Sequence, residues 1–293
     1  MFSHAGAVLG IALASLAALL PASSAAAQSV DYDRLLETAR RQQVATFWMT
    51  TDALLVALGI ESEERASHLR TIRAEFDTTL KGLRNGDAGL GLPAATEPSI
   101  AEPLDSALEL WSRSDTLIVA GLDRAAFTED ELLSIAGQGQ RIRDSIGEAA
   151  EVFDREARVG EMSSMMDTAI NIIAEIRMLS QRMGTEFLMI TNGLQVDRFR
   201  RQLIESSADY ERRLIGLIEG DVDLLLLPAP TEALRSRLRR LLIAWQEDLE
   251  PVLRRAIEGN ALTPAQIVDA IRLCETVYEE SGAAVEEYQA LRP

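Results

Sequence analysis

Cysteine, histidine and aromatic residues are all scarce in this chain, which has one cysteine, two histidines and only 5% aromatics. Because Cys274 stands alone, no internal disulfide can form. Its helical spacing with Ile267, Ile271 and Tyr278 predicts a buried, small apolar side chain, and an intermolecular disulfide is the alternative. His68 lies in a charged stretch, so we expect it to be exposed rather than catalytic.

The motifs of the common enzyme and cofactor classes are also missing. The sequence has no Glu-x-x-His pair for a di-iron bundle, no nucleophile motif, no phosphate loop and no cysteine pair. Acidic clusters such as Glu129-Asp130-Glu131 lie at predicted helix starts, where the helix dipole accounts for them. We therefore expect a protein that is not an enzyme and that holds no metal or cofactor.

The first 27 residues contain no Lys, Arg, Asp or Glu, are apolar from Ala5 to Leu20, and end in three alanines. This pattern predicts a signal peptide cleaved after Ala27, and therefore a periplasmic or secreted protein, with an uncleaved membrane anchor as the alternative. No later segment has the 18 consecutive apolar residues of a membrane span. The net charge of −17 gives the chain no electrostatic footprint for nucleic acid.

Apolar residues recur at helical spacing nearly throughout, and strand-like alternation is absent. The pattern predicts an all-α protein. Start signals come from Ser99 with Glu102, Thr128 with Glu131, Asp197, and Thr263 followed by Pro264. The predicted helices span 30–58, 62–84, 99–121, 128–157, 161–192, 197–218, 231–257 and 263–289.

Sliding the chain along itself by 134 residues reveals an internal duplication. Gly193 then falls on Gly59, Leu214 on Leu80, and Trp245 on Trp111. With four helices and short connections, each copy should form an antiparallel four-helix bundle. The predicted domains are the signal peptide at 1–27, a first bundle at 28–158 and a second bundle at 159–293.

The fifth predicted helix carries an unusual polar stretch, EIRMLSQRM at 175–183, beside its apolar stripe. Arg182 has Glu186 at i+4, so we expect an exposed intrahelical ion pair. Arg177 has no acidic residue three or four positions away, and an unpaired buried charge costs roughly 3 to 5 kcal/mol. A guanidinium beside the hydroxyl of Ser180 and the amide of Gln181 suits a small planar oxyanion, whereas an acidic residue on a neighbouring helix is the alternative partner.

Three stretches of the second copy resemble a known family: RMLSQRM at 177–183, YERRLIGLIEGD at 210–221 and LPAPTEALRSRLRRLLIAW at 227–245. They are similar to the extracytoplasmic sensor domain shared by PilJ-type chemotaxis transducers of type IV pili and NarX-like nitrate/nitrite sensor kinases. The first copy is similar to the upstream part of the family pattern at Ala39-Arg40-Arg41-Gln42. It then has Gln43, Thr46, Phe47 and Trp48 where the second copy has Arg177, Ser180, Gln181 and Arg182.

The resemblance implies that Arg177 binds a small anion such as nitrate or nitrite at an interface between two copies of the domain. Because Gln43 carries no charge, a site between the two copies of one chain would hold a single arginine. A homodimer through the second bundle would supply two. No membrane-spanning or signalling segment follows the second copy, so we expect ligand binding to be relayed to a separate membrane signalling or transport protein.

Two functions follow from these observations. The first is a periplasmic or secreted sensor module that binds a small oxyanion through Arg177, Ser180 and Gln181. The alternative is a structural or interaction protein without a small-molecule ligand. It rests on DVDLLLLPAP at 221–230, whose leucines are either tucked beneath the helices or exposed to a partner. The arginines at 235, 237, 239 and 240 read as a solvated helix face.

Overall fold

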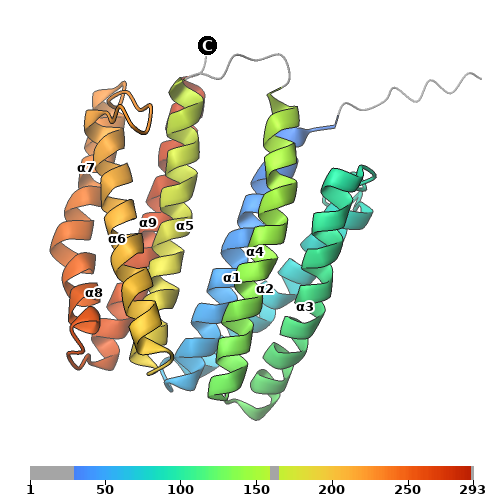
Figure 1. Ribbon diagram of the computed structural model, residues 1–293, viewed down its shortest axis with the longest axis vertical. Coiled ribbons are helices and arrows are strands. Elements are labelled where there is room, and N and C mark those ends of the chain that lie inside the picture. The colour runs from blue at the N-terminus through green and yellow to red at the C-terminus, as the bar shows by residue number, and fades with distance from the viewer. Residues whose placement is uncertain (1–29, 159–164, 292–293) are drawn as a thin grey trace, which may run out of the picture. The chain divides into compact units, whose positions relative to one another are not determined.

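The computed structural model describes residues 30–158 and 165–291, and those from Asp31 onward belong to one compact unit (Figure 1). The described residues form helices and no strands, so the predicted all-α fold with two packed groups of helices is confirmed. The first group contains α1 (Tyr32–Ala57), α2 (Ser62–Asn85), α3 (Pro98–Arg124) and α4 (Glu129–Ala157). The second contains α5 (Met165–Thr191), α6 (Val196–Glu219), α7 (Glu232–Ala244), α8 (Glu250–Ile257) and α9 (Pro264–Ala290). The predicted signal peptide and the junction at 159–164 lie outside the described residues.

Two of the four predicted helix starts are confirmed by their hydrogen bonds. Thr128 and Thr263 each form a capping box with the side chain three residues later. The predictions for Ser99 and Asp197 were wrong. Pro98 takes the first position of α3 because it has no backbone N–H to leave unpaired, which makes Glu97 the N-cap. Residue 195, in the left-handed conformation, precedes α6 and places Asp197 inside its first turn.

The predicted helix at 231–257 is interrupted by a π-helical turn, Trp245–Leu249, between α7 and α8. Pro251 follows within two residues. A proline ring clashes with the carbonyl four residues earlier, and the wider π turn relieves such crowding. Periodicity does not reveal this change because the buried face continues through it, with Trp245, Leu249 and Leu253 all in the core.

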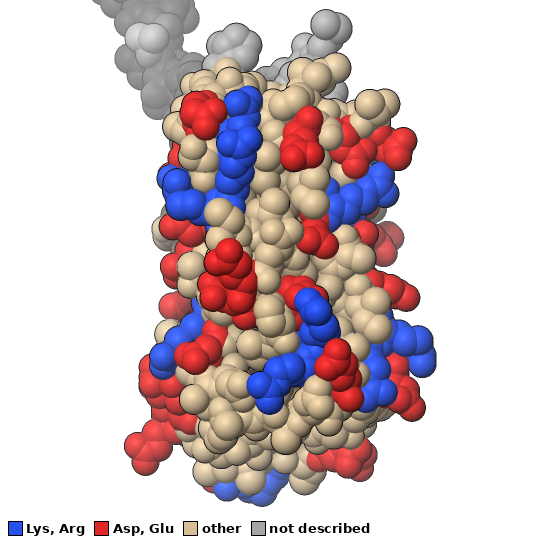
Figure 2. Space-filling model, turned by 90° about the vertical axis from the view of Figure 1, so that its left-hand side faces the viewer, with Lys and Arg blue, Asp and Glu red and all other residues tan. Residues whose placement is uncertain are grey.

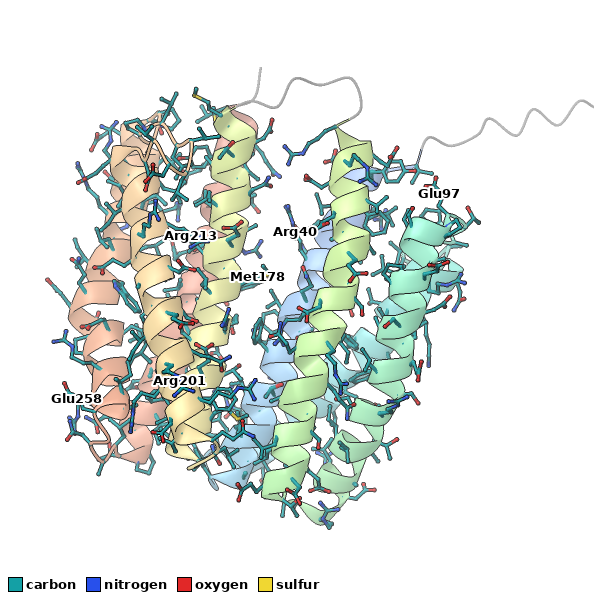
Figure 3. All side chains as sticks on the ribbon, viewed as in Figure 1. Arg40, Glu97, Met178, Arg201, Arg213 and Glu258 are labelled. Carbon is teal, nitrogen blue, oxygen red and sulfur yellow. The ribbon has the colours of Figure 1, made fainter. Side chains whose placement is uncertain are left out.

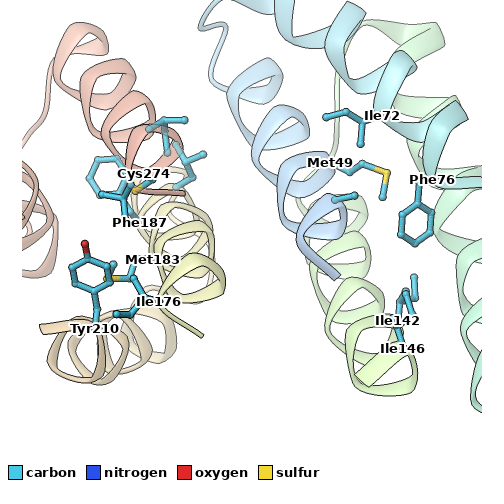
Figure 4. Close-up of a cluster of buried hydrophobic side chains, with 14 of the residues drawn as sticks. Met49, Ile72, Phe76, Ile142, Ile146, Ile176, Met183, Phe187, Tyr210 and Cys274 are labelled. Carbon is cyan, nitrogen blue, oxygen red and sulfur yellow. The ribbon is translucent and has the colours of Figure 1, made fainter. Parts of the chain in front are cut away.

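The two bundles repeat the same local features at the spacing of 134 residues. Glu61 and Gln195 both precede the second helix of their bundle in the left-handed conformation. The bridge between Asp87 and Leu92 recurs between Asp221 and Leu226. In the cores, Phe76 packs on Trp111 with ring centroids 4.6 Å apart, and Tyr210 packs on Trp245 at 4.8 Å. Figure 4 shows Phe76 pointing into the first bundle and Tyr210 into the second. Cys274 of α9 is buried within the second group, as its spacing predicts.

The bundles meet where α1 packs against α5. Residues 50–56 of α1 and 183–190 of α5 are all buried, so these segments have no solvent-facing side. The Oγ atoms of Thr51 and Thr185, which are equivalent positions of the two copies, lie 3.3 Å apart. An approximate twofold relation between the bundles therefore passes through this contact.

A charged cluster joins α2 to α9 beside this contact. The guanidinium of Arg65 donates to Glu61, Asp52 and Glu275, at 3.1 to 3.5 Å. Asp52 is buried and its Oδ2 lies 2.8 Å from Nδ1 of His68. About half of the His68 side chain is exposed, in agreement with the prediction that it is a surface residue.

This cluster should make stability fall as pH rises. The hydrogen bond with Asp52 raises the pKa of His68 above its ordinary value, and burial raises the pKa of Asp52. Both groups therefore bind protons more tightly in the folded chain. The contribution of His68 is complete below about pH 6.5 and is lost as pH rises through its folded pKa, with about 1 kcal/mol or less at stake because the side chain is half exposed.

Urea unfolding between pH 5.5 and 8.5 measures this decrease. His68→Gln should flatten it, whereas Arg70→Gln, an exposed change on the same helix, should retain it. An unchanged slope in His68→Gln would show that other groups cause the pH dependence.

Candidate binding pocket between the bundles

The arginines of α7 are not a site. Arg235 pairs with Glu232 at 3.0 Å, and Arg237 pairs with Glu280 and Glu287 of α9. Figure 2 shows basic and acidic side chains interspersed on this side of the second bundle, with no large surface of one sign. The prediction of a solvated helix face fits this arrangement.

Arg182 and Glu186 form the predicted ion pair on α5, with Nε 2.7 Å from Oε1. The prediction that this pair is exposed was wrong for the glutamate, because only 5% of the Glu186 side chain is accessible. Burial raises the pKa of Glu186, while the charge of Arg182 opposes that shift. A single-helix pattern could not show that another bundle covers this face of α5.

Ser180 and Gln181 are buried and make contacts within the protein. The Ser180 hydroxyl donates to the backbone carbonyl of Arg177 at 2.9 Å. The Gln181 amide donates to the carbonyl of Cys274 and accepts from the indole N–H of Trp48, both at 3.0 Å. Gln181 therefore ties α5 to α9 within its bundle and to α1 of the other bundle. Neither side chain reaches the pocket that contains Arg177.

Arg177 lines a pocket of about 230 Å³ formed by α1, α5 and α9. We call it the Arg177 pocket, and its charged and aromatic wall consists of Glu37, Arg40, Arg41, Glu175, Arg177 and Tyr278. The guanidinium carbon of Arg177 lies 4.3 Å from the centre of the Tyr278 ring. Figure 3 shows Arg40 of α1 and Met178 of α5, which also lines the pocket, on the facing sides of the two bundles.

The charges of this pocket are unequally compensated. Arg41 pairs with Glu37 at 3.0 Å, and Glu175 pairs with Arg213 at 2.8 Å. Arg40 donates to Asn171 at 3.2 Å and lies 3.9 Å from Asp154. No acidic side chain of the described residues lies within 4.0 Å of the Arg177 guanidinium. Its buried Nε also has no hydrogen-bond partner in this part of the chain.

The positive charge of Arg177 affects the pKa values of two neighbouring groups. Burial lowers the pKa of Arg40, and the charge of Arg177 acts in the same direction. Burial raises the pKa of Tyr278, and the charge of Arg177 opposes this. Arginine stays protonated at neutral pH, so two cations face one small pocket. An anion placed between them would lower their mutual repulsion and fill the hydrogen-bonding capacity of Arg177.

Arg40 is the functional candidate that the sequence argument missed. A site between the two copies was expected to hold one arginine, because Gln43 occupies the position equivalent to Arg177. The pocket instead contains Arg40, which lies one turn earlier on α1. Arg40 is part of the stretch Ala39-Arg40-Arg41-Gln42 that resembles the family pattern. Only the contact between α1 and α5 shows that Arg40 lines the same pocket as Arg177.

Residues 161–273 match the PilJ family, described as the N-terminal region of type IV pili methyl-accepting chemotaxis transducers. The matched segment covers the wall of the pocket that α5 supplies and stops within α9. The first bundle lies outside the match. No curated protein and no solved structure gives a significant match to the chain. The second bundle is thus similar to the PilJ N-terminal domain over residues 161–273.

No group of three or more His, Cys, Asp or Glu side chains in residues 30–158 and 165–291 is arranged to hold a metal ion. None of the described helices combines the length and apolarity that crossing a membrane requires.

Gln181→Met should separate a structural role of this residue from ligand binding. The change keeps a similar side-chain length but leaves the indole N–H of Trp48 without its acceptor, at a cost of roughly 1 to 3 kcal/mol. Urea unfolding at pH 7 measures the loss, with Arg41→Gln as the exposed control of near-wild-type stability. A Gln181→Met protein within about 0.5 kcal/mol of the wild type would contradict the structural role.

Proposed function

We propose that this protein is an extracytoplasmic sensor module whose Arg177 pocket binds a small oxyanion of the nitrate or nitrite type. The observation that carries this proposal is the state of Arg177. Its guanidinium is the one charged group of the pocket wall that has no oppositely charged side chain within 4.0 Å among the described residues. It interacts with Tyr278, and its Nε has no hydrogen-bond partner in the same part of the chain. A buried charge without an oppositely charged partner destabilises the fold, and a bound anion would remove this cost.

The geometry of the pocket favours a small, planar anion. A guanidinium can donate two parallel hydrogen bonds to two oxygen atoms of one ligand. Tyr278 covers one face of Arg177, which leaves the edge of the guanidinium, with its N–H groups, for the ligand. Arg40 supports the same ligand from α1, so one anion would contact both bundles.

A ligand that contacts α1 and α5 together would act on the relation between the bundles. In this proposal the first bundle is a diverged PilJ-type copy that takes the place of a second subunit. Binding would favour one arrangement of the two bundles, and a separate membrane signalling or transport protein would read that arrangement. The charge-free, apolar segment at 1–27 supports a periplasmic or secreted location. A homodimer through the second bundle stays a prediction.

Isothermal titration calorimetry of the mature chain with nitrate, nitrite and chloride tests the proposal. We expect nitrate or nitrite to bind and chloride to bind at least about tenfold more weakly. Chloride is monatomic, so it has no second acceptor atom for a pair of parallel hydrogen bonds. Arg177→Gln should weaken binding by at least about tenfold, since it removes a charged hydrogen-bond donor.

Arg41→Gln is the matched control, because Arg41 lines the same pocket but is already paired with Glu37 and is largely exposed. It should change the affinity by less than about threefold. Absence of heat and of a thermal shift with every anion, or equal losses in both variants, would refute an Arg177-centred site.

The loop between α6 and α7 favours the alternative of a docking protein. Leu226 is buried, but Val222, Leu225 and Leu227 are 89%, 70% and 59% exposed. Leu225 also has a φ of +56°, in the left-handed region, where the equivalent position of the first copy is Gly91. A leucine costs about 1 to 2 kcal/mol in this conformation, so an exposed apolar loop is maintained against local strain.

Single substitutions in this loop distinguish core from surface leucines. Leu226→Ala should destabilise the protein by about 2 to 5 kcal/mol, because the residue is buried. Leu225→Gly should leave stability unchanged or raise it by up to about 1 kcal/mol, since glycine adopts a positive φ without strain. Thermal and urea unfolding measure both changes, and equal destabilisation by the two variants would show that the whole loop is core.

A further inference from the structure

A second pocket, on the other side of the α1–α5 contact, also collects arginines. This Arg143 pocket has a volume of about 250 Å³, near the lower limit of small-ligand sites. Arg143 comes from α4, Arg182 from α5, and Arg198 from the first turn of α6. It shares no residue with the Arg177 pocket, so its ligand chemistry can be argued independently.

The charges of the Arg143 pocket do not cancel. Arg182 is neutralised by Glu186, which is the only acidic residue of the pocket wall. Arg143 lies over the Phe47 ring and donates to Thr46 and Gln140, at 2.7 and 3.0 Å, without reaching a carboxylate of the described residues.

Arg198 lies at the exposed edge of the same wall and bonds to the side chain of Gln195 at 2.9 Å. It too reaches no carboxylate of the described residues. Burial lowers the pKa of Arg143 to about 9, so it stays charged at neutral pH. The pocket therefore has two arginines that form no ion pair within 4.0 Å among the described residues, although Asp144 and Glu186 are near enough to raise the pKa of Arg143 against the effect of burial.

The duplication provides an internal comparison for this pocket. The equivalent hollow, between α2 and α9, is lined by four glutamates, Glu61, Glu64, Glu275 and Glu279, together with Arg65 and Arg272. At the positions that correspond to Glu61, Glu64 and Glu275, the Arg143 pocket has Gln195, Arg198 and Gln140. The capping boxes at Thr128 and Thr263 fix the correspondence between α4 and α9. Three of the four glutamates of that hollow thus correspond to neutral or basic side chains in the Arg143 pocket, whereas the fourth, Glu279, corresponds to Asp144.

We propose that the Arg143 pocket binds a small organic dianion, a dicarboxylate. Two guanidiniums that lack carboxylate partners, one at the pocket wall in α4 and one at its edge in α6, match two carboxylates of one molecule. Apolar side chains of Phe47, Met189 and Phe199 line the rest of the wall and suit a short carbon chain between the two charged ends. Inorganic phosphate would satisfy the charge but not this apolar wall.

Calorimetry of the mature chain with succinate, acetate and inorganic phosphate tests the proposal. Succinate should bind at least about tenfold more tightly than either of the others, because acetate leaves one arginine unpaired and phosphate lacks a carbon chain. Equal binding of phosphate would indicate a site that recognises charge alone and would overturn the dicarboxylate assignment.

Substitutions at exposed positions locate the site without disturbing the fold. Gln140→Glu combined with Gln195→Glu introduces the two acidic groups that Glu275 and Glu61 supply in the equivalent hollow and should weaken succinate binding by at least about tenfold, as should Arg198→Gln. Arg177→Gln should leave succinate binding unchanged, which separates this site from the proposed oxyanion pocket. Succinate affinity that is unaffected by the double variant and by Arg198→Gln would refute the proposal.

Discussion

The packing of α1 against α5 is the constraint on which the remaining structure depends. Most helices of a bundle bury one stripe of side chains. Residues 50–56 of α1 and 183–190 of α5 are buried on all sides, because one side packs into the core of their own bundle and the other packs against the neighbouring bundle. Polar side chains that this contact buries therefore need hydrogen-bond partners, because an unpaired buried polar group is destabilising. Trp48 with Gln181, and Thr51 with Thr185, meet this requirement. The same contact brings Arg40 and Arg177 into one pocket.

The helices and their order could be predicted because their signals are local. Thr128 with Glu131 and Thr263 with Gln266 specify helix starts within four residues, and the apolar period identifies one buried face. The second buried face of α5 was not predictable, because amphipathic spacing says nothing of a neighbour that is more than a hundred residues away. For this reason Gln181 was assigned to a ligand although it joins the bundles, and Arg40 was not assigned at all. The π turn before Pro251 likewise preserves the buried stripe from which the helix was predicted.

The two copies have diverged in complementary ways. The first copy contributes Arg40 to the Arg177 pocket, and the second copy contributes Arg177 itself. Facing each other across the α1–α5 contact, they assemble one pocket from two incomplete copies. The hollows on either side of the contact differ in the same manner, since glutamates of the first copy correspond to glutamine and arginine in the second. Divergence has therefore changed electrostatics while the cores, with their paired aromatic rings, have been retained.

In a homodimer built like these two bundles, the twofold axis would pass between the hydroxyls that correspond to Thr51 and Thr185. In a homodimer, any substitution beside the axis appears on both sides, so a favourable change on one side brings its copy on the other. A single polypeptide escapes this restriction, and Trp48 can face Gln181 although the equivalents of these residues are Arg182 and Phe47. Covalent linkage also makes the encounter of the two halves independent of protein concentration. Dilution would dissociate a weak dimer but would leave this interface intact.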